Sequence, residues 1–348
     1  MSYTVCITGG TGSFGQAMTR LLLNSSDWKV RVLSRSEYPQ VEMKKNFNDS
    51  RVTFMLGDVC DIDRLRMAFD GCDLVLHAAA LKHVPVGESN PDEVVRVNID
   101  GSRNVVRAAR DCHVNQAILI SSDKAVHPIN LYGSTKLTAE KLFINGNSYT
   151  QQTRLNVCRY GNVMGSRGSV SEIWQYMIAR GLPLGLTDMN MTRFWFSMVD
   201  ALRFVLWCAA ENQKGVIFVP HMPAFDMYDL MHAMLAKTTL VINQDYVLMG
   251  MRPGEKMHEY ILTEHEVAAS RTFLHADDET VQVLDSGEQV VRGSVYAHAV
   301  FPANTDWEIV PYDPERWRDL RDHLGATDSQ KWPWRLSIDH ILARLKQL

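Results

Sequence analysis

Two short segments carry side chains that can move protons. Ser122, Asp123 and Lys124 follow an apolar run, and Tyr132 and Lys136 stand a few residues further on. Tyr132 and Lys136 are four residues apart, so in a helix they share one face. A phenol has a pKa of about 10 and is a poor base at neutral pH, but a nearby ammonium group lowers that pKa. The pattern predicts these five residues as catalytic; the alternatives are a core tyrosine with a satisfied hydroxyl and a structural Asp–Lys pair.

A glycine-rich turn lies near the start of the chain. The segment Thr8–Gly15 follows a strand-like run and opens a helical pattern, and Gly10, Gly12 and Gly15 fit G-x-G-x-x-G. In that pattern the glycines make a tight turn, admit a pyrophosphate to the backbone and let the helix pack on the strand. The helix N-terminus adds unpaired N–H groups. This predicts a dinucleotide site, with a plain strand-to-helix turn as the alternative. Its expected residues are Gly9, Thr11, Gly12, Ser13, Phe14 and Gly15.

The end of the second expected strand bears on the choice between NAD and NADP. NAD sites usually carry an acidic residue there, on the ribose hydroxyls. This chain reads Leu33-Ser34-Arg35-Ser36, with no carboxylate until Glu37. Arg35 can hold a 2′-phosphate through two parallel hydrogen bonds, and Ser34 can donate another. Ser34, Arg35 and Ser36 therefore favour NADP, and a solvated loop arginine is the alternative.

Strand-like and helical patterns alternate over the first two-thirds of the chain. Strand, helix and strand at this spacing indicate parallel strands with right-handed crossovers. We therefore expect an α/β fold with an NAD(P)-binding, Rossmann-type, doubly wound parallel sheet. Asp58 and Val59, after the third strand, are expected to border the adenine. The expected strands are Val5–Thr8, Val30–Leu33, Val52–Leu56, Leu74–Ala78, Ile118–Ser121, Leu155–Arg159 and Val216–Val219, and the helices include Ser13–Leu23, Pro91–Cys112 and Tyr132–Phe143.

The alternation of strand-like and helical patterns becomes irregular after about residue 162, where several prolines separate shorter elements. We expect residues 1–162, rejoined by a strand near 215–220, to form the NADP-binding domain. Residues 163–348 are expected to form mainly a smaller C-terminal substrate-binding lobe and a tail. Within it, Asp277–Pro314 is polar with strand-like patterning. Ser337–Leu348 is expected to be an amphipathic helix that docks on a core or a subunit.

Composition argues against several classes of protein. The 348 residues are 46% apolar and 22% charged, which is ordinary for a globular chain. The 36 Lys and Arg residues against 40 Asp and Glu residues give a net charge of −4. This charge argues against a protein that binds nucleic acid through its overall charge. No apolar run approaches the roughly 20 residues that cross a bilayer, and no signal peptide is visible. With six dispersed cysteines and no metal-binding spacing among twelve histidines, we expect a cytoplasmic protein without a metal, nucleic-acid or membrane partner.

Several segments occur together in one known family. They are Thr8–Gly15; His77–Pro85; Ser122–Ala125 with Pro128 and Asn130; Tyr132–Lys136; Arg159–Val163 with Ser166–Val170; Met191–Phe194; and Arg252–Lys256. In this combination the chain resembles the extended short-chain dehydrogenase/reductases, and more narrowly the inverting UDP-N-acetylglucosamine 4,6-dehydratases of bacterial surface-sugar biosynthesis. The specific feature is Lys124 after Asp123, because retaining hexose dehydratases carry an acid pair there and simple 4-epimerases carry neither arrangement. Ser122 stands where the family usually has threonine.

The resemblance implies an NADP-dependent lyase that yields a UDP-2-acetamido-2,6-dideoxy-hexos-4-ulose. Tyr132 takes the O4 proton while hydride passes from C4 to NADP⁺. Lys124 then removes H5, water leaves C6 with Asp123 as the proton donor, and hydride returns to C6. Reprotonation of C5 from the opposite face gives inversion. To act as a base near neutrality, Lys124 needs a pKa about 3 units below its ordinary value of about 10.4. A buried, dry site beside Lys136 and the nicotinamide is expected to supply that shift.

The resemblance also assigns residues that hold the two ligands. Around the cofactor it places Ala78, Ala79, Ala80, Lys82, Asn98, Tyr160 and Asn162, with Asn98 supporting the backbone near the catalytic strand. Around the UDP-sugar it places Lys82, Asn162, Arg193, Arg252 and Glu255. A helix-surface residue is the alternative for Asn98, and surface salt bridges are the alternative for the two arginines. A homo-oligomer, either a dimer or a hexamer, is also expected.

Two other functions stay open. One is a nucleotide-sugar 4-epimerase, or a dehydratase that stops at a different product, and detection of a stable 6-deoxy-4-keto sugar would separate these. The other is a non-enzymatic, NADP-sensing regulator on a degenerate dehydrogenase fold. Such regulators usually lose the tyrosine–lysine pair, whereas Tyr132 and Lys136 are both present.

Overall fold

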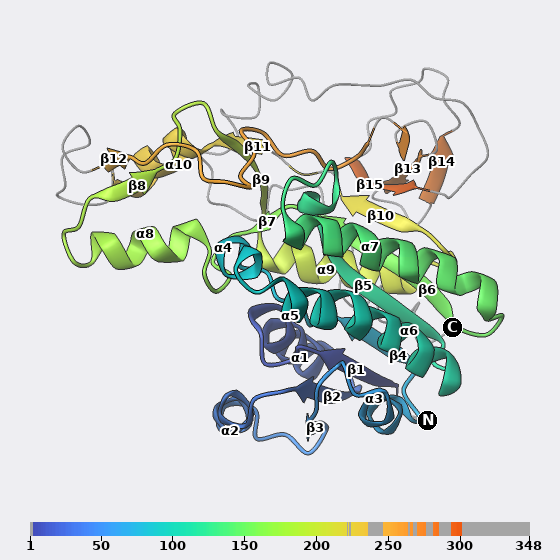
Figure 1. Cartoon of the computed structure of the whole chain (residues 1–348). Helices are drawn as coiled ribbons and strands as arrows, with labels where there is room; N and C mark the ends of the chain where they lie inside the picture. Colours follow the sequence, from blue (N-terminus) through green and yellow to red (C-terminus); the bar gives the residue numbers. More distant parts are fainter. Residues whose placement is uncertain are drawn as a thin grey trace.

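The computed structural model describes residues 3–220, 222, 224–235, 246–263, 265–266, 270–275, 281–284 and 294–300. In this part of the chain a large twisted sheet lies between two layers of helices, and a smaller group of elements lies to one side of it (Figure 1). The expected terminal helix Ser337–Leu348 lies outside the described residues.

The expected parallel sheet is confirmed. Its parallel strands run in the order β3-β2-β1-β4-β5-β6-β10, which reverses direction between β1 and β4 as a doubly wound fold requires. These strands are β1 (Thr4–Thr8), β2 (Lys29–Ser34), β3 (Val52–Leu56), β4 (Leu74–His77), β5 (Gln116–Ser122), β6 (Arg154–Tyr160) and β10 (Ile217–Pro220).

The chain returns to the sheet at β10, which pairs with β6 in parallel. Beyond β10 three antiparallel strands extend the same sheet in the order β15-β13-β14. They are β13 (Ser270–His275), β14 (Val281–Leu284) and β15 (Ser294–Val300). Two of them, β14 and β15, lie within Asp277–Pro314, the stretch expected to have strand-like patterning.

Helices cover both faces of the sheet because the strand side chains alternate in direction. Val5 and Ile7 of β1 pack in one apolar cluster with α1 (Ser13–Ser25), α2 (Glu37–Asn46) and α9 (Met198–Ala210). Cys6 between them packs in the other, with α3 (Ile62–Phe69), α6 (Gly101–Asp111) and α7 (Leu131–Gly146). A strand buried on both faces therefore has a continuous apolar sequence, and β1 follows this pattern.

The single helix expected over Pro91–Cys112 is wrong in one respect. The chain there forms α5 (Pro91–Val95), then a π-helical turn, η1 (Arg96–Asp100), and then α6. Such turns occur frequently at functional sites. This one contains Asn98, whose buried side chain bonds both backbone groups of Leu81 and the hydroxyl of Thr135.

The smaller group of elements has an apolar cluster of its own. Trp174, Leu186 and Met231 are among its buried members. The group comprises α8 (Val170–Ile178), β8 (Leu184–Leu186), β12 (Tyr246–Leu248) and α10 (Met227–Leu235), together with the sheet of β7 (Asn162–Val163), β9 (Thr192–Phe196) and β11 (Ala224–Asp226). In Figure 1, α8, β8, β12 and α10 project beyond the edge of the main sheet.

Candidate active site

A cavity of about 640 Å³ lies beyond the carboxyl ends of the parallel strands. Its walls come from the turns after β1, β2, β3, β4, β5 and β6 and from the segment that leads to α8. In an open α/β sheet this edge is the usual place for a ligand. The described residues that line it include five cationic side chains and no Asp or Glu: Arg35, Lys82, Lys124, Lys136 and Arg167. The cavity therefore favours a polyanionic occupant.

The glycine turn fits a dinucleotide pyrophosphate. Gly9 has φ +67°, and a Cβ on it would lie 2.8 Å from the backbone of Ala79, so only glycine suits this position. Gly12 precedes α1 without a side-chain cap, which leaves the helix N-terminus open toward the cavity. Gly9, Thr11, Gly12, Ser13 and Phe14 all line the cavity. Gly15 lies buried in the first turn of α1, behind the lining.

The residues expected at the adenosine end lie together. Ser34, Arg35 and Ser36 line the cavity, and so does Val59. Gln40 donates to the Ser34 hydroxyl oxygen over 2.9 Å, so the Ser34 hydroxyl proton is directed elsewhere. The Arg35 side chain is 46% exposed and lies 3.7 Å from Glu93, which leaves it available to a phosphate.

The predicted residues Asp58 and Asn98 do not line the cavity themselves. Asp58 bonds the backbone of Cys60 and lies 3.7 Å from Arg96, while its neighbours Gly57 and Val59 form the wall. Asn98 lies behind the wall and hydrogen-bonds both backbone groups of Leu81, which itself lines the cavity. Both therefore support the wall.

The catalytic segment ends β5 in a short 3₁₀ turn, η2 (Asp123–Ala125). Asp123 is fully buried, and its Oδ1 accepts from the Ser122 hydroxyl over 2.8 Å and from Lys124 Nζ over 3.0 Å. Its Oδ2 is buried without a hydrogen-bond partner among the described residues. Ser122 and Lys124 line the cavity, while Asp123 lies behind them.

Helix α7 brings Tyr132 and Lys136 to the same place. Asn130 caps the helix by accepting from Gly133 N over 2.8 Å. A Cβ on Gly133 would lie 2.2 Å from the Lys124 carbonyl oxygen, so this glycine lets α7 press directly against η2. Tyr132 and Lys136 both line the cavity, and Lys136 Nζ donates to the Ile120 carbonyl over 2.6 Å. The five predicted catalytic residues thus form one cluster.

The protonation of this cluster differs partly from expectation. Burial lowers the pKa of Lys136 to about 8, and the attraction of Glu140 offsets only part of that effect. For Tyr132, burial raises the pKa above its ordinary value, while Lys124 and the interaction with Ser122 lower it by less. The lowering expected from a nearby ammonium is present, through Lys124, but burial outweighs it, so the pKa of Tyr132 lies above its ordinary value in the free protein.

The depression of the Lys124 pKa, expected from burial beside Lys136 and the nicotinamide, is not present in the free protein. Burial does lower that pKa, but the attraction of Asp123 and of Glu259 outweighs burial and raises it above its ordinary value. The Glu259 carboxylate lies 3.5 Å from Lys124 Nζ and is 5% exposed. A buried ammonium between two carboxylates keeps its proton.

Glu259 and Lys256 were missed by the sequence analysis. Lys256 Nζ donates to the Val126 carbonyl over 2.6 Å and lies 3.6 Å from Glu259, so the segment after Pro253 is attached beside η2. The resemblance of Arg252–Lys256 to the family pointed to this segment of the chain. Glu259 lies three residues beyond Lys256 and belongs to no motif that the sequence shows.

The remaining predicted residues divide into two groups. The first lines the cavity: Ala78, Ala79, Ala80, Lys82, Tyr160 and Asn162. The Asn162 Oδ1 atom is buried without a partner among the described residues, as expected of an acceptor that awaits a ligand. The second group lies outside the lining and contains Arg193, Arg252 and Glu255.

Two residues of that second group are near each other. Arg193 is buried, donates to the carbonyls of Thr192 and Met257, and lies 3.7 Å from Glu255. Arg252 is exposed and contacts the Met249 sulfur over 3.8 Å. In the free protein Arg193 therefore attaches β9 to the segment that carries Glu259.

Two features are absent from the part of the chain that the structure describes. No group of three or more His, Cys, Asp or Glu side chains there could hold a metal ion. No helix in the same part of the chain is long and apolar enough to cross a membrane.

A Rossmann-type cavity for a nicotinamide dinucleotide, closed at one end by a tyrosine and a lysine of a single helix, is the arrangement of the extended short-chain dehydrogenase/reductases. This chain is an enzyme of that superfamily. More narrowly, it belongs to the family described as polysaccharide biosynthesis proteins, whose model matches residues 5–277.

Known relatives agree with this assignment. The chain is 44% identical over 287 residues to an inverting UDP-N-acetylglucosamine 4,6-dehydratase of Campylobacter jejuni, covering 81% of this chain and 84% of that protein. It is 39% identical over 271 residues to a UDP-glucose 4-epimerase of Rickettsia prowazekii, covering 76% and 79%. The solved structure of Pen from Bacillus thuringiensis matches with a TM-score of 0.78 at 31% identity, covering 92% of this chain and 98% of that one. Both dehydratases and epimerases of nucleotide sugars are thus among the relatives of this chain.

Proposed function

We propose that this enzyme is an NADP-dependent UDP-N-acetylglucosamine 4,6-dehydratase that inverts C5. The observation that carries the proposal is the pairing of Lys124 with buried Asp123, next to Tyr132 in the same cavity. The 44% identical Campylobacter jejuni relative of that name supports the choice of substrate. The positive lining suits two ligands that both carry diphosphates.

The first step is the oxidation of C4. Tyr132 accepts the proton of the O4 hydroxyl, and Lys136 beside it stabilises the phenolate that this requires. When bound, the nicotinamide ring accepts the C4 hydride and later returns it to C6 of the same sugar. The C4 hydroxyl thereby becomes a ketone, which acidifies the hydrogen on C5.

The second step is the loss of water across C5 and C6. Lys124 accepts the C5 proton, and the C6 hydroxyl leaves as water with a proton from Asp123. In the free protein Lys124 holds a proton and Asp123 accepts a hydrogen bond from it over 3.0 Å. Transfer of that proton from Lys124 to Asp123 would create a neutral amine base and a carboxylic acid together, without a proton from outside. The pair therefore acts as one unit.

The last step returns hydride to C6 and a proton to C5. A proton from solvent enters C5 on the face opposite to the one from which Lys124 removed H5 and inverts that carbon. Tyr132 releases the O4 proton to solvent, which closes the proton balance of the cycle. The product keeps its 4-ketone and gains a 6-methyl group. Because no reducing equivalent leaves the site, the cofactor shows no net change.

Proton NMR with UDP-N-acetylglucosamine in deuterated water tests the proposal. We expect a new 6-methyl signal, deuterium at C5 and the inverted C5 configuration. Retained C5 configuration would contradict the inverting assignment. The 39% identity to a UDP-glucose 4-epimerase keeps epimerisation as a second candidate, and in that case the spectrum would show a C4 epimer with an intact C6 hydroxymethyl group.

The cofactor preference gives a separate prediction. Arg35→Ala should weaken binding of NADP(H) about ten- to a hundredfold, because a charge-assisted contact with a 2′-phosphate contributes about 1.5–3 kcal/mol. Binding of NAD(H), which lacks that phosphate, should hardly change. Fluorescence titration with NADPH and NADH measures both affinities.

The matched control is Arg103→Ala, since Arg103 is exposed on α6 and paired with Asp100 away from the cavity. It should leave both affinities unchanged. Equal losses for NADPH and NADH in Arg35→Ala would remove Arg35 from the phosphate site. A homo-oligomer and a cytoplasmic location stay predictions from the sequence.

A further inference from the structure

The loop between β7 and α8 forms one wall of the cavity, and it has no role in the reaction above. Ser166, Arg167, Gly168 and Ser169 all belong to the lining. The turn is closed on itself, since Ser169 N donates to the Ser166 carbonyl over 2.9 Å. Its far end is held as well, because Ser169 caps α8. The loop is therefore ordered before any ligand arrives.

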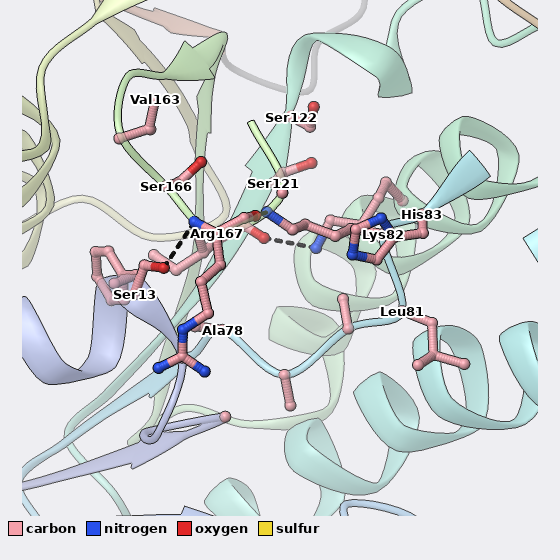
Figure 2. A pocket seen from close by; sticks show the side chains of 18 of the residues that line it. Ser13, Ala78, Leu81, Lys82, His83, Ser121, Ser122, Val163, Ser166 and Arg167 are labelled. Atoms are coloured by element: carbon pink, nitrogen blue, oxygen red, sulfur yellow. Dashed lines mark hydrogen bonds between the residues drawn. The ribbon is translucent and has the colours of Figure 1, made fainter. Parts of the chain in front are cut away.

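Arg167 connects the loop to both sides of the cavity, as Figure 2 shows. On one side its backbone N–H donates to the Ser13 hydroxyl oxygen over 3.0 Å, at the N-terminus of α1. On the other side its carbonyl accepts from Lys82 Nζ over 2.7 Å. The loop thus spans the cavity from the glycine turn to the segment after β4. We call Ser166–Ser169 the strap.

The Arg167 guanidinium lies next to the glycine turn. Its Nη2 donates to the Thr11 carbonyl over 3.1 Å, while its other guanidinium N–H groups have no hydrogen-bond partner among the described residues. Burial lowers the Lys82 pKa, and the attraction of Glu172 offsets part of that effect, while the charges of Lys124 and Arg167 lower the pKa further. The Arg167 cation beside the N-terminus of α1 favours an anion there.

We propose that Arg167 binds the pyrophosphate of the dinucleotide and that the strap retains the cofactor between turnovers. The inference rests on the proposed function, in which hydride leaves and re-enters the same sugar. An enzyme of that kind gains nothing from releasing its cofactor in each cycle. The free guanidinium donors of Arg167 and the α1 N-terminus would then hold the diphosphate from two sides.

Cofactor release from the full-length enzyme tests the proposal without turnover. Arg167→Ala should raise the dissociation constant of NADPH about ten- to a hundredfold, as expected for loss of a charge-assisted contact. It should also speed NADPH release in a fluorescence chase with excess NADP⁺. Binding of adenosine 2′-monophosphate, which lacks the pyrophosphate, should stay unchanged. Arg167→Lys keeps the charge without the planar fork and should show a smaller loss.

The control variant is Arg180→Ala, because Arg180 stacks on Tyr176 just beyond α8 and does not line the cavity. It should bind NADPH as the wild type does. Wild-type affinity in both Arg167 variants would overturn the inference alone, and loss of UDP binding with intact NADPH binding would reassign Arg167 to the sugar nucleotide. Failure of the wild type to bind NADPH or NADH would instead contradict the proposed function.

Discussion

Lys124→Ala should slow formation of the 6-deoxy-4-keto product by about 10²–10⁴, the usual contribution of a positioned acid or base. The variant keeps Tyr132 and Lys136, so C4 oxidation stays possible while elimination fails. In single turnover with bound NADP⁺, absorbance at 340 nm should therefore rise and persist, because hydride has left C4 and has no C6 acceptor. Wild-type enzyme should show at most a brief rise.

The control is Lys141→Ala, since Lys141 is exposed on α7 and lies outside the cavity lining. That variant should turn over at the wild-type rate. If Lys124→Ala makes product at nearly the wild-type rate, the inverting dehydratase assignment loses its main support. Lys82 and His83, which also line the cavity, would be the next candidates for the base.

The surroundings of Lys124 add a pH profile to this prediction. The charged groups that act on it are Asp123 on its own turn, Glu259 on the segment after Pro253 and Arg193 on β9. Their net effect holds its pKa above the ordinary value, so Lys124 of the free enzyme keeps its proton through the neutral range. Moving that proton to Asp123 leaves the number of bound protons unchanged, so the share of the active form does not depend on pH there. The value of kcat/KM reports the free enzyme, and this pair should leave it level through the neutral range. A tenfold rise of kcat/KM for each pH unit would contradict the internal proton transfer.

Tyr132→Phe should abolish turnover at an earlier point. Without the phenol no group accepts the O4 proton, so we expect a loss of about 10²–10⁴ in kcat with no bound NADPH at 340 nm. Affinity for NADPH should change little, because the phosphates are held elsewhere in the cavity. The two variants thus differ in one signal: the lysine variant accumulates reduced cofactor, and the tyrosine variant does not.

Tyr149→Phe is the matched control, because Tyr149 is 69% exposed and lies beyond the end of α7. It should behave as the wild type. Accumulation of bound NADPH in Tyr132→Phe would show that another group accepts the O4 proton. Ser122, which lines the cavity and interacts with Tyr132, would then be the residue to replace.

The sequence by itself determined most of the sheet and the identity of the catalytic cluster. Strand β3 begins and ends where the apolar run does, and β1 differs from its expected bounds by one residue. The glycine turn and the spacing of Tyr132 and Lys136 were equally readable. All of these depend on backbone geometry within a few residues, or on which side chains must be buried, and both leave a direct pattern in the sequence.

The tertiary structure alone decided the charge state of the site and the contacts that close it. Glu259 raises the pKa of Lys124 from 135 positions further along the chain, and Arg167 reaches Ser13 across 154 positions. The π turn at Asn98 likewise follows from what its side chain must hold. Electrostatic energies depend on distance and burial, and folding sets both by bringing remote segments together. The sequence therefore identified Lys124 as a candidate base, and only the fold showed that the free enzyme holds it protonated.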